Sequence, residues 1–209
     1  MTLREALTLG KDLLQKANIE EFETDAWLLL EAAAKCTRND FFLRGAKPLT
    51  KEQELLYKEY LEKRSRRIPV QHILGVQCFC GLDFIVTPDV LCPRLDTEVL
   101  IEEALKRIRP GSGILDMCTG SGCIILTLLH FVKNCKGTGV DLSEKALAVA
   151  KQNAAKLGKE CTFIQSDLFE NIEGRFDVII SNPPYIATKE IEALEPEVRE
   201  HEPMMALDG

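Results

Sequence analysis

The order of hydrophobic and polar positions divides the chain into two parts. Over roughly the first seventy residues, apolar side chains recur at the three- and four-residue spacing of amphipathic helices. Helices are predicted over about 3–17 and 24–34 and from 50 to a point before Pro69. A short turn of helix is predicted over 41–45. Thr2-Leu3-Arg4-Glu5 fits a capping box, and Gly10 is a weak point in the first helix. This part is predicted to be a small helical bundle without a catalytic constellation.

One apolar stripe of this bundle can be assigned to particular side chains. Leu55, Leu56 and Leu61 fall on one face of the helix that begins near residue 50, and we expect that face to lie in the core.

The pattern changes at Ile68. Apolar residues 76–79 and 84–86 flank residues 80–83 and predict a β-hairpin. A helix is predicted over 99–108, and strands and helices then alternate, which is typical of a parallel sheet. Strands are predicted at 114–117, 137–141, 161–164 and 176–180, and helices at 123–132 and 143–157. The chain is therefore divided into a helical domain (1–70), a hairpin linker (71–92) and an α/β domain (93–209).

Composition adds limits on the kind of protein. Hydrophobic residues make up 45% of the chain and charged residues 28%, an ordinary mix for a globular domain. No apolar run reaches membrane-spanning length, and residues 1–5 do not begin a signal peptide, so we expect a cytoplasmic protein. The eight cysteines form no Cys-x-x-Cys pair, and most lie in apolar runs. They predict buried thiols in a reducing compartment and no metal site.

The net charge of −7 is unevenly distributed. Residues 1–75 carry 13 basic and 12 acidic side chains, and the remainder carries 13 and 21, so the two parts have charges of +1 and −8. The acidic second part argues against a large nucleic-acid footprint. Lys63, Arg64, Arg66 and Arg67 form one basic cluster. Compensation of a helix dipole is the favoured interpretation of this cluster, and contact with an acidic or RNA-bound partner is the alternative.

The strongest candidate for chemistry is the segment Ser181-Asn182-Pro183-Pro184-Tyr185. It follows the buried strand predicted at 176–180, at the edge where open α/β sheets bind ligands. The two prolines stiffen the loop and keep the residues before them extended. The carbonyl oxygens of Asn182 and Pro183 are then free to accept hydrogen bonds, and Tyr185 offers a flat ring. Such a pocket suits a planar NH2 group.

The ends of the preceding strands suggest a nucleoside site. Residues 118–122, Cys-Thr-Gly-Ser-Gly, form a small-residue loop before a helix, where backbone N–H groups can approach a ligand. Asp141 follows about twenty residues later and is placed to accept from ribose hydroxyls. Asp167 can accept from an adenine amino group. The stretch contains no phosphate-binding lysine, so a nucleoside fits better than ATP.

These motifs together resemble those of class I S-adenosylmethionine-dependent methyltransferases, which have a Rossmann-like, doubly wound sheet. The matching segments are Asp116-x-Cys-Thr-Gly-Ser-Gly, Gly139-Val-Asp141-Leu-Ser, Gln165-Ser-Asp167-Leu168-Phe and Asn182-Pro-Pro-Tyr185. Within that class, the whole chain resembles the glutamine methyltransferases of peptide chain release factors. The helical first part, Ile68 to Gly75 (Ile-Pro-x-x-x-Ile-Leu-Gly) and Pro93-Arg94-x-Asp96-Thr97-Glu98 carry this closer resemblance.

The resemblance implies a role for each part of the site. Cys118, Thr119, Gly120, Ser121 and Gly122 would wrap the methionine part of S-adenosylmethionine, Asp141 would hold the ribose, and Asp167 and Leu168 would flank the adenine. Asn182, Pro183, Pro184 and Tyr185 would hold the glutamine amide, with Asn182 also near the cofactor. The catalytic set would be Asn182, Pro183 and Tyr185.

Three features depart from the family pattern. Cys118 stands where many members have glycine, so we expect it to have a negative φ and to contribute only its backbone. Leu95 replaces a usual proline. The family continues beyond residue 209 with further strands, so the sheet is expected to be C-terminally truncated. Strand 176–180 is then an apolar edge, and we expect residues 1–209 to be oligomeric or poorly soluble and weakly active.

The resemblance implies methyl transfer to the side-chain amide nitrogen (N5) of the glutamine in the GGQ motif of class I release factors. The full-length protein is expected to be monomeric, with no stable nucleic-acid partner. Three alternatives stay open. They are a glutamine methyltransferase of a large-subunit ribosomal protein, a DNA or RNA amino-methyltransferase, and a non-catalytic cofactor-binding fragment.

Overall fold

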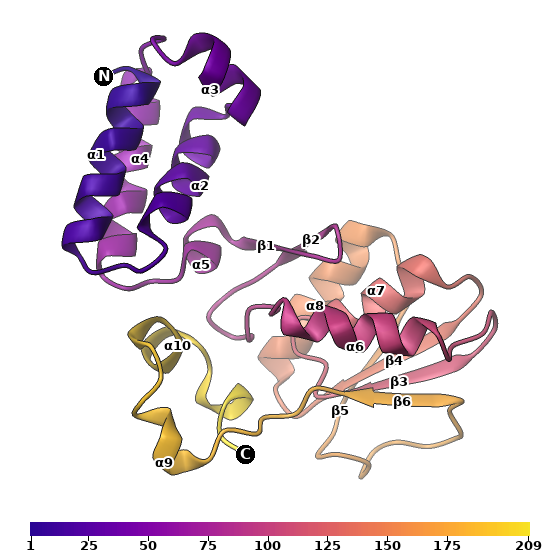
Figure 1. The fold of residues 1–209 in the computed structure, drawn as a ribbon. Helices are drawn as coiled ribbons and strands as arrows, with labels where there is room; N and C mark the ends of the chain where they lie inside the picture. Colours follow the sequence, from indigo (N-terminus) through magenta and orange to yellow (C-terminus); the bar gives the residue numbers. More distant parts are fainter. The chain divides into compact units, whose positions relative to one another are not determined.

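The computed structural model describes residues 1–209, which form two compact units, Met1–Leu74 and Gly75–Gly209 (Figure 1). The hairpin belongs to the second unit. Its role as a linker, and the domain limits at residues 70 and 92, stay predictions. Each unit is described by itself below. No helix in the chain combines the length and the apolarity needed to cross a membrane.

The first unit is the predicted helical bundle. Its helices are α1 (Leu3–Lys16), α2 (Phe22–Ala34), α3 (Arg38–Arg44), α4 (Lys51–Ser65) and the short α5 (Val70–Leu74). Thr2, Thr37 and Thr50 each begin a helix with a complete capping box, in which a side chain three residues later bonds back to the threonine N–H. The capping box predicted at Thr2 is therefore confirmed, and the same device sets the start of two further helices.

Gly10 is a packing site of this bundle, which the sequence alone did not indicate. The residue is buried on α1, and a Cβ added to it would lie 2.0 Å from the Tyr57 hydroxyl oxygen. Tyr57, on α4, is fully buried and donates a hydrogen bond to the Ala26 carbonyl at 3.0 Å. Glycine therefore lets α1 lie against the ring that links α4 to α2.

One expectation for α4 is corrected. Leu55 is 70% exposed, whereas Tyr57 and Leu61 provide the buried face, because the helix turns Leu55 away from α1 and α2.

Lys63 and Arg64 of the basic cluster lie in the last turn of α4, where basic side chains complement the helix dipole, but Arg64 is not at the surface. It is buried, and its Nε donates to Asp25 Oδ2 at 2.6 Å, whereas Lys63 pairs with Glu59 one helical turn away.

The second unit contains a hairpin and an α/β fold. The strands are β1 (Val76–Phe79), β2 (Leu82–Ile85), β3 (Gly113–Met117), β4 (Lys136–Asp141), β5 (Thr162–Gln165) and β6 (Val178–Ser181). The helices are α6 (Asp96–Leu105), α7 (Cys123–Phe131), α8 (Glu144–Leu157), α9 (Thr188–Ile191), α10 (Pro196–His201) and a 3-10 turn, Met204–Ala206. Every strand and long helix predicted here is present.

The largest boundary error concerns α6, which begins three residues before the predicted start at Val99. Asp96 and Glu98 occupy its first turn, where acidic side chains are favoured by the helix dipole. Glu98 also accepts a hydrogen bond from Cys80 N at 2.7 Å. The polar residues just before the predicted start therefore form the first turn of the helix, and one of them bonds to the turn of the hairpin.

The four-stranded sheet has the order β5-β4-β3-β6, with all three neighbouring pairs parallel. The strand order reverses between β3 and β6, so the first strand of the sheet has the second and fourth strands as its neighbours. This is the arrangement of a Rossmann-like sheet, and ligands bind at such a reversal, beyond the carboxyl ends of the strands. The predicted fold class is confirmed.

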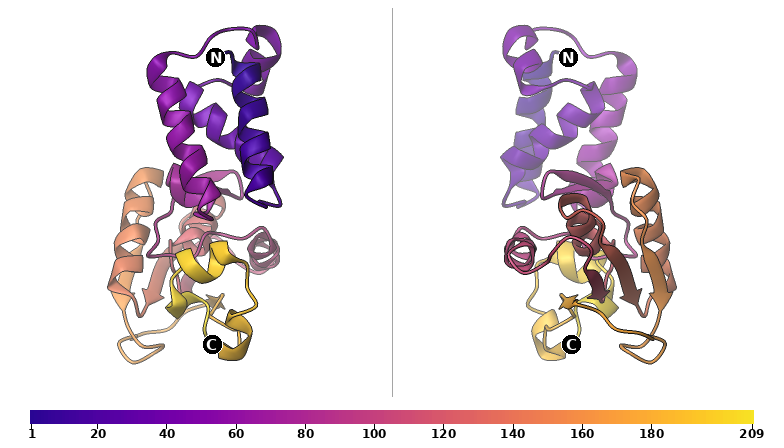
Figure 2. Two further views of the ribbon diagram at one scale, coloured as in Figure 1. Left: turned by 90° about the vertical axis from the view of Figure 1, so that its left-hand side faces the viewer. Right: turned by 90° about the vertical axis from the view of Figure 1, so that its right-hand side faces the viewer.

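The main core lies between the sheet and α6, α7 and α8, which cover one face (Figure 1). In the views of Figure 2, α8, drawn in orange, runs alongside the strands. Side chains alternate along β3, so Ile114 joins the helix-side core and Leu115 packs on the other face with Ile164 and Phe176.

Strand β6 lies at the sheet edge, as predicted, and bonds to β3 alone. Ile179 in this strand is 56% exposed. The segment after β6 forms α9, α10 and the 3-10 turn and adds no strand to the sheet. Self-association and weak activity of residues 1–209 stay predictions.

We expect Gly10→Ala to destabilise the first unit by about 1–3 kcal/mol, the usual cost of overpacking a core. A gain in helix propensity of about 1 kcal/mol opposes this loss, so the net effect measures the clash with Tyr57. Trp27 is the only tryptophan and lies in this unit, so urea unfolding followed by its fluorescence reports the change. Leu9→Ala, next to it on α1, is the matched control. A Gly10→Ala protein as stable as the unsubstituted chain would contradict the packing argument.

Candidate active site

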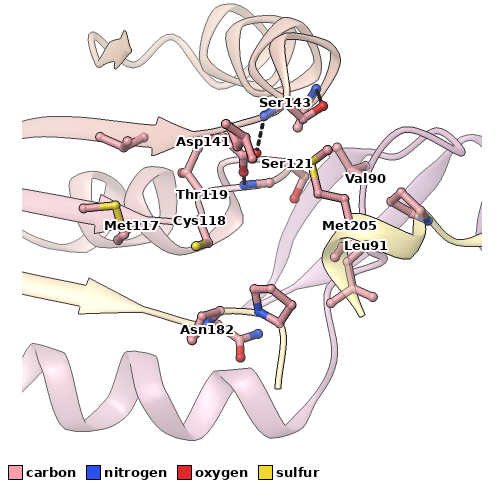
Figure 3. Close-up of a pocket in the computed structure, with 18 of the residues that line it drawn as sticks. Val90, Leu91, Met117, Cys118, Thr119, Ser121, Asp141, Ser143, Asn182 and Met205 are labelled. Carbon is pink, nitrogen blue, oxygen red and sulfur yellow. Dashed lines mark hydrogen bonds between the residues drawn. The ribbon is translucent and has the colours of Figure 1, made fainter. Parts of the chain in front are cut away.

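A cavity of about 630 Å³ opens at the carboxyl ends of the sheet strands (Figure 3). Its volume falls within the range of small-molecule sites. The walls come from the loops after β3, β4, β5 and β6, together with residues before α6 and the segment after α10. The cavity therefore lies at the reversal of strand order, where the sheet topology predicts a ligand.

The loop after β3 forms one wall. Thr119 N donates to Val140 O at 2.8 Å, which fixes the loop to the end of β4. Gly122 begins α7 with a φ of 78°, and a Cβ added there would come within 3.2 Å of the Ala150 Cβ on α8. Glycine at 122 thus meets both a left-handed backbone and a close approach between loop and helix.

The expectation for Cys118 is wrong. Its φ is +60°, in the left-handed region, because the chain turns sharply from β3 into the loop at this residue. Its side chain also lines the cavity, and in Figure 3 it lies between Asp141 and Asn182. Burial raises the pKa of the Cys118 thiol and the nearby Asp141 carboxylate raises it further, so the thiol is not an activated nucleophile.

Asp141 joins the loop after β3 to the start of α8. Its Oδ2 accepts from Gly120 N at 2.8 Å and its Oδ1 accepts from Ser143 N at 2.9 Å (Figure 3). Each carboxylate oxygen can accept a second hydrogen bond. Asp141 is therefore placed at the cavity as predicted, and it has an additional structural role as the acceptor that orders Gly120.

Asp116 lies beneath the same loop and is fully buried. Its Oδ2 accepts from Thr119 Oγ1 at 2.6 Å and from Ile125 N at 3.3 Å, whereas its Oδ1 has no partner. Burial raises its pKa from 3.8 to about 7, and the two hydrogen bonds only partly oppose that rise. Burial therefore favours the neutral, protonated form of this carboxyl group.

The other predicted cofactor residues also line the cavity. Asp167 and Leu168 follow β5, and both are exposed at the cavity rim. Ser166, buried beside them, donates through its hydroxyl to Leu168 O at 3.0 Å. The predicted nucleoside residues after β3, β4 and β5 thus meet at one cavity.

The loop after β6 brings Asn182, Pro183 and Pro184 to the same cavity. Ser181 Oγ donates to Met117 O at 2.9 Å and ties the start of this loop to β3.

Tyr185 does not line the cavity, and its side chain is 78% exposed. The next residue, Ile186, bonds through its N–H to Leu207 O and through its carbonyl to Gly209 N, both at 3.0 Å. This pairing joins the residue after Tyr185 to the segment after α10, while the Tyr185 ring itself lies outside the cavity. The arrangement therefore gives no support to the stacking role expected of Tyr185.

Several lining residues were not singled out from the sequence. Met205, Ala206 and Asp208 come from the segment after α10 and close one side of the cavity. No periodicity or motif spacing marks these three positions, since they reach the cavity only through folding of a distant segment. Arg94, which belongs to the motif at 93–98 but was given no role, also lines the cavity and donates from Nη2 to Glu202 Oε2 at 2.8 Å.

Fold and cavity together define a class I methyltransferase. Two family models match the chain, "PrmC N-terminal domain" over residues 5–75 and "Methyltransferase small domain" over residues 84–198. The chain belongs to the family of release factor glutamine methyltransferases. A protein of that name from Geobacter sulfurreducens is 43% identical over 100% of this chain and 74% of its own length. One from Caulobacter vibrioides is 42% identical, again over 100% of this chain and 74% of its own length.

Among solved structures, a tRNA uracil-54 methyltransferase of Pyrococcus abyssi in complex with S-adenosyl-L-homocysteine is 20% identical to this chain. The match has a TM-score of 0.44 and covers 60% of this chain and 30% of that one. At this TM-score the likeness adds nothing to the family assignment.

The buried Asp116 predicts a pH dependence of stability. Between about pH 4 and pH 7 the folded state holds a proton that the unfolded state has released, because the pKa is about 7 in the fold and 3.8 ordinarily. The second unit should therefore lose stability as the pH rises through this window and change little from this source above it. Hydrogen exchange of β3 and β4 amides at several pH values measures the effect. Asp116→Asn should flatten the profile, and an unchanged profile in that variant would contradict the assignment.

Proposed function

We propose that this chain binds S-adenosylmethionine in the cavity beside β3 and methylates a glutamine side-chain amide of a class I release factor, in its GGQ motif. One observation carries the proposal. A single cavity joins the loop at Gly120 and the Asp141 carboxylate to the Asn182 loop. A nucleoside cofactor and an amide can therefore reach each other there. Membership of the release factor glutamine methyltransferases supports the choice of substrate.

The chemistry of the cavity wall fits the cofactor. Asp141 offers free lone pairs to ribose hydroxyls, and Asp167 offers an acceptor to the adenine amino group. Leu142 and Leu168 add apolar surface for the base. The loop at residues 118–122 would lie along the methionine part. Bound S-adenosylmethionine supplies a methyl group that its sulfonium already activates, so the chain need not create an electrophile.

The task left to the protein is to hold a weak nucleophile. An amide nitrogen is unreactive because its lone pair is delocalised into the carbonyl. The Asn182 side-chain oxygen and the Pro183 carbonyl would accept its two hydrogens. These bonds orient the nitrogen and strengthen as its N–H groups become more acidic. Such positioning contributes several kcal/mol, up to about 7–11 in the best cases.

Proton removal needs no dedicated base in this scheme. The Cys118 thiol, which lies near Asn182, has a raised pKa and stays protonated. The proton is instead lost to solvent after the new bond forms. Tyr185 would contribute at the cavity only if it left its exposed position, so we assign the holding of the amide to Asn182 and Pro183.

Cysteine state and net charge support the expected compartment and the expected kind of partner. All eight cysteines are free thiols, which suits the reducing cytoplasm. The net charge of −8 on residues 76–209, from 13 basic and 21 acidic side chains, favours a protein substrate over a nucleic acid. We propose a cytoplasmic monomer in its full-length form, without a stable nucleic-acid partner.

Transfer of a tritiated methyl group tests the function directly. The chain is incubated with labelled S-adenosylmethionine and one of three acceptors: a purified class I release factor, a large-subunit ribosomal protein, or DNA. Label should enter the release factor and be lost when its GGQ glutamine is replaced. Label in the ribosomal protein or DNA alone would overturn the substrate assignment. Cofactor binding without transfer to any acceptor would identify a non-catalytic fragment.

Asp141→Ala should weaken binding of S-adenosylhomocysteine by about 1.5–3 kcal/mol, the range for hydrogen bonds to a charged group. The ribose contacts and the bond that orders Gly120 are both lost. Calorimetry measures the change, and Glu144→Ala, on an exposed acid of α8, is the control. Unchanged affinity would remove Asp141 from the ribose role.

Asn182→Ala should abolish most methyl transfer and leave cofactor affinity within about tenfold, or 1.4 kcal/mol. The reason is that Asn182 holds the amide and the nucleoside contacts come from other strands. Steady-state kinetics with the release factor and calorimetry with S-adenosylhomocysteine give the two values. Gln152→Ala removes an exposed amide elsewhere and serves as control. Collapse of cofactor binding with substantial turnover would reverse the assigned roles.

A further inference from the structure

Asn153 is a fully buried polar side chain in the middle of α8. Polar residues in such positions are costly unless all their hydrogen-bonding groups are used. Its Oδ1 accepts from Ile85 N at 2.6 Å, and its Nδ2 donates to Ile85 O at 3.0 Å and to Ser121 O at 2.9 Å. Three bonds thus satisfy the two donors and the acceptor of one amide.

The partners of Asn153 belong to two segments far apart in sequence. Ile85 ends strand β2 of the hairpin, and Asn153 bonds to both its N–H and its carbonyl in the manner of a neighbouring strand. Ser121 lies between Gly120 and Gly122 in the loop after β3, where it is 2% exposed. The side chain therefore joins the hairpin, α8 and the loop at one point.

A second contact shows that α8 supports this loop along one face. Ala150 precedes Asn153 by three residues and so lies on the same side of the helix. Its Cβ is the atom that a side chain at Gly122 would approach most closely, together with Leu126 Cδ1. Gly122 packs on α8 through Ala150, and the adjacent peptide at Ser121 is held by Asn153. Ala150 and Asn153 themselves do not line the cavity.

The loop has a complementary support on its other side. Asp141 accepts from Gly120 N and Asn153 donates to Ser121 O, so the Thr119–Gly120 and Ser121–Gly122 peptide groups are directed by two different side chains. Gly120 and Gly122 both have positive φ values, and glycine backbones in this region move easily when unrestrained. Without the Asn153 bond, Ser121 O would lose its side-chain partner. The stretch would keep the Asp141 bond, the turn bond from Gly122 N to Thr119 O at 2.8 Å and the contact with Ala150.

We propose that Asn153 is a positioning residue for cofactor binding. It fixes the Ser121 carbonyl against α8 and so holds the Gly120–Gly122 backbone in the form that receives the cofactor. This inference rests on the proposed function and adds to it a residue outside the cavity. Because the same amide also bonds to Ile85 of β2, one side chain fixes the position of the hairpin relative to the cofactor loop.

Two substitutions test the role in the full chain. Asn153→Ala removes all three bonds. Asn153→Asp keeps the shape and the bond from Ile85 N but places an oxygen against the carbonyls of Ile85 and Ser121. Both should raise the dissociation constant of S-adenosylhomocysteine by about tenfold or more, equivalent to 1.4 kcal/mol. In turnover assays the KM for S-adenosylmethionine should rise more than kcat falls, because the amide-holding loop is untouched.

Controls separate positioning from loss of stability. Ala154→Gly weakens the same helix next to Asn153, and Gln152→Ala removes an exposed amide on the other side. If Ala154→Gly and Asn153→Ala lower the melting temperature equally, Ala154→Gly should still leave the dissociation constant of S-adenosylhomocysteine within about twofold. That change is smaller than the tenfold change, equivalent to 1.4 kcal/mol, expected for Asn153→Ala. Equal affinities for Asn153→Ala and Ala154→Gly would overturn the proposal and leave Asn153 a purely structural residue.

A readout independent of the cofactor keeps the two hypotheses distinct. Amide exchange at Gly120 and Gly122, measured without ligand, should accelerate in Asn153→Ala and not in Ala154→Gly. If the unsubstituted chain binds no S-adenosylhomocysteine, the proposed function fails, and the exchange rates still decide whether Asn153 sets the loop. If Asn153→Asp does not fold, Asn153→Ala alone supplies both measurements. Unchanged exchange in that variant would contradict the positioning role.

Discussion

The parallel pairing of β3 with β4 on one side and β6 on the other is the constraint on which the site depends. In parallel strands the carboxyl ends meet at one edge, so the chain must leave all three strands at the same place. The return connections diverge from that edge and open a crevice between the loops after β3 and β6. Asp141 and Asn182 are forty-one positions apart in the sequence. Both reach one cavity because each follows the end of a parallel strand, and no direct contact between them is needed.

Several groups hold the loop after β3, because the backbone of its glycines has little conformational restraint of its own. Asp141 accepts from Gly120 N, Thr119 bonds to Val140 O and to Asp116, and Asn153 holds Ser121 O. Carboxyl, hydroxyl and amide side chains thus serve one purpose, the ordering of this loop. Such redundancy is the usual means of keeping a flexible backbone in the geometry that a ligand requires.

Buried polar groups play different roles in the two units. In the first unit, the pair Arg64–Asp25 and the Tyr57–Ala26 bond link helices that packing already brings together. In the second unit, Asp116 and Asn153 lie beneath the loop that forms the cavity wall. Burial of a polar group costs free energy unless the group forms hydrogen bonds. The Oδ1 atom of Asp116 forms none, so part of this cost remains at that residue.

The sequence determined the order of elements, the parallel sheet and most of the site, because periodicity and strand-end motifs are local and strand ends converge by topology alone. Asp141, Asp167 and Asn182 were found in this way. Only the tertiary structure decided the rest. The positive φ of Cys118 follows from the turn out of β3. The Tyr185 ring lies outside the cavity, next to the point where Ile186 pairs with Leu207 and Gly209. The roles of Gly10 and Asn153 likewise depend on partners distant in sequence, so no local pattern could have revealed them.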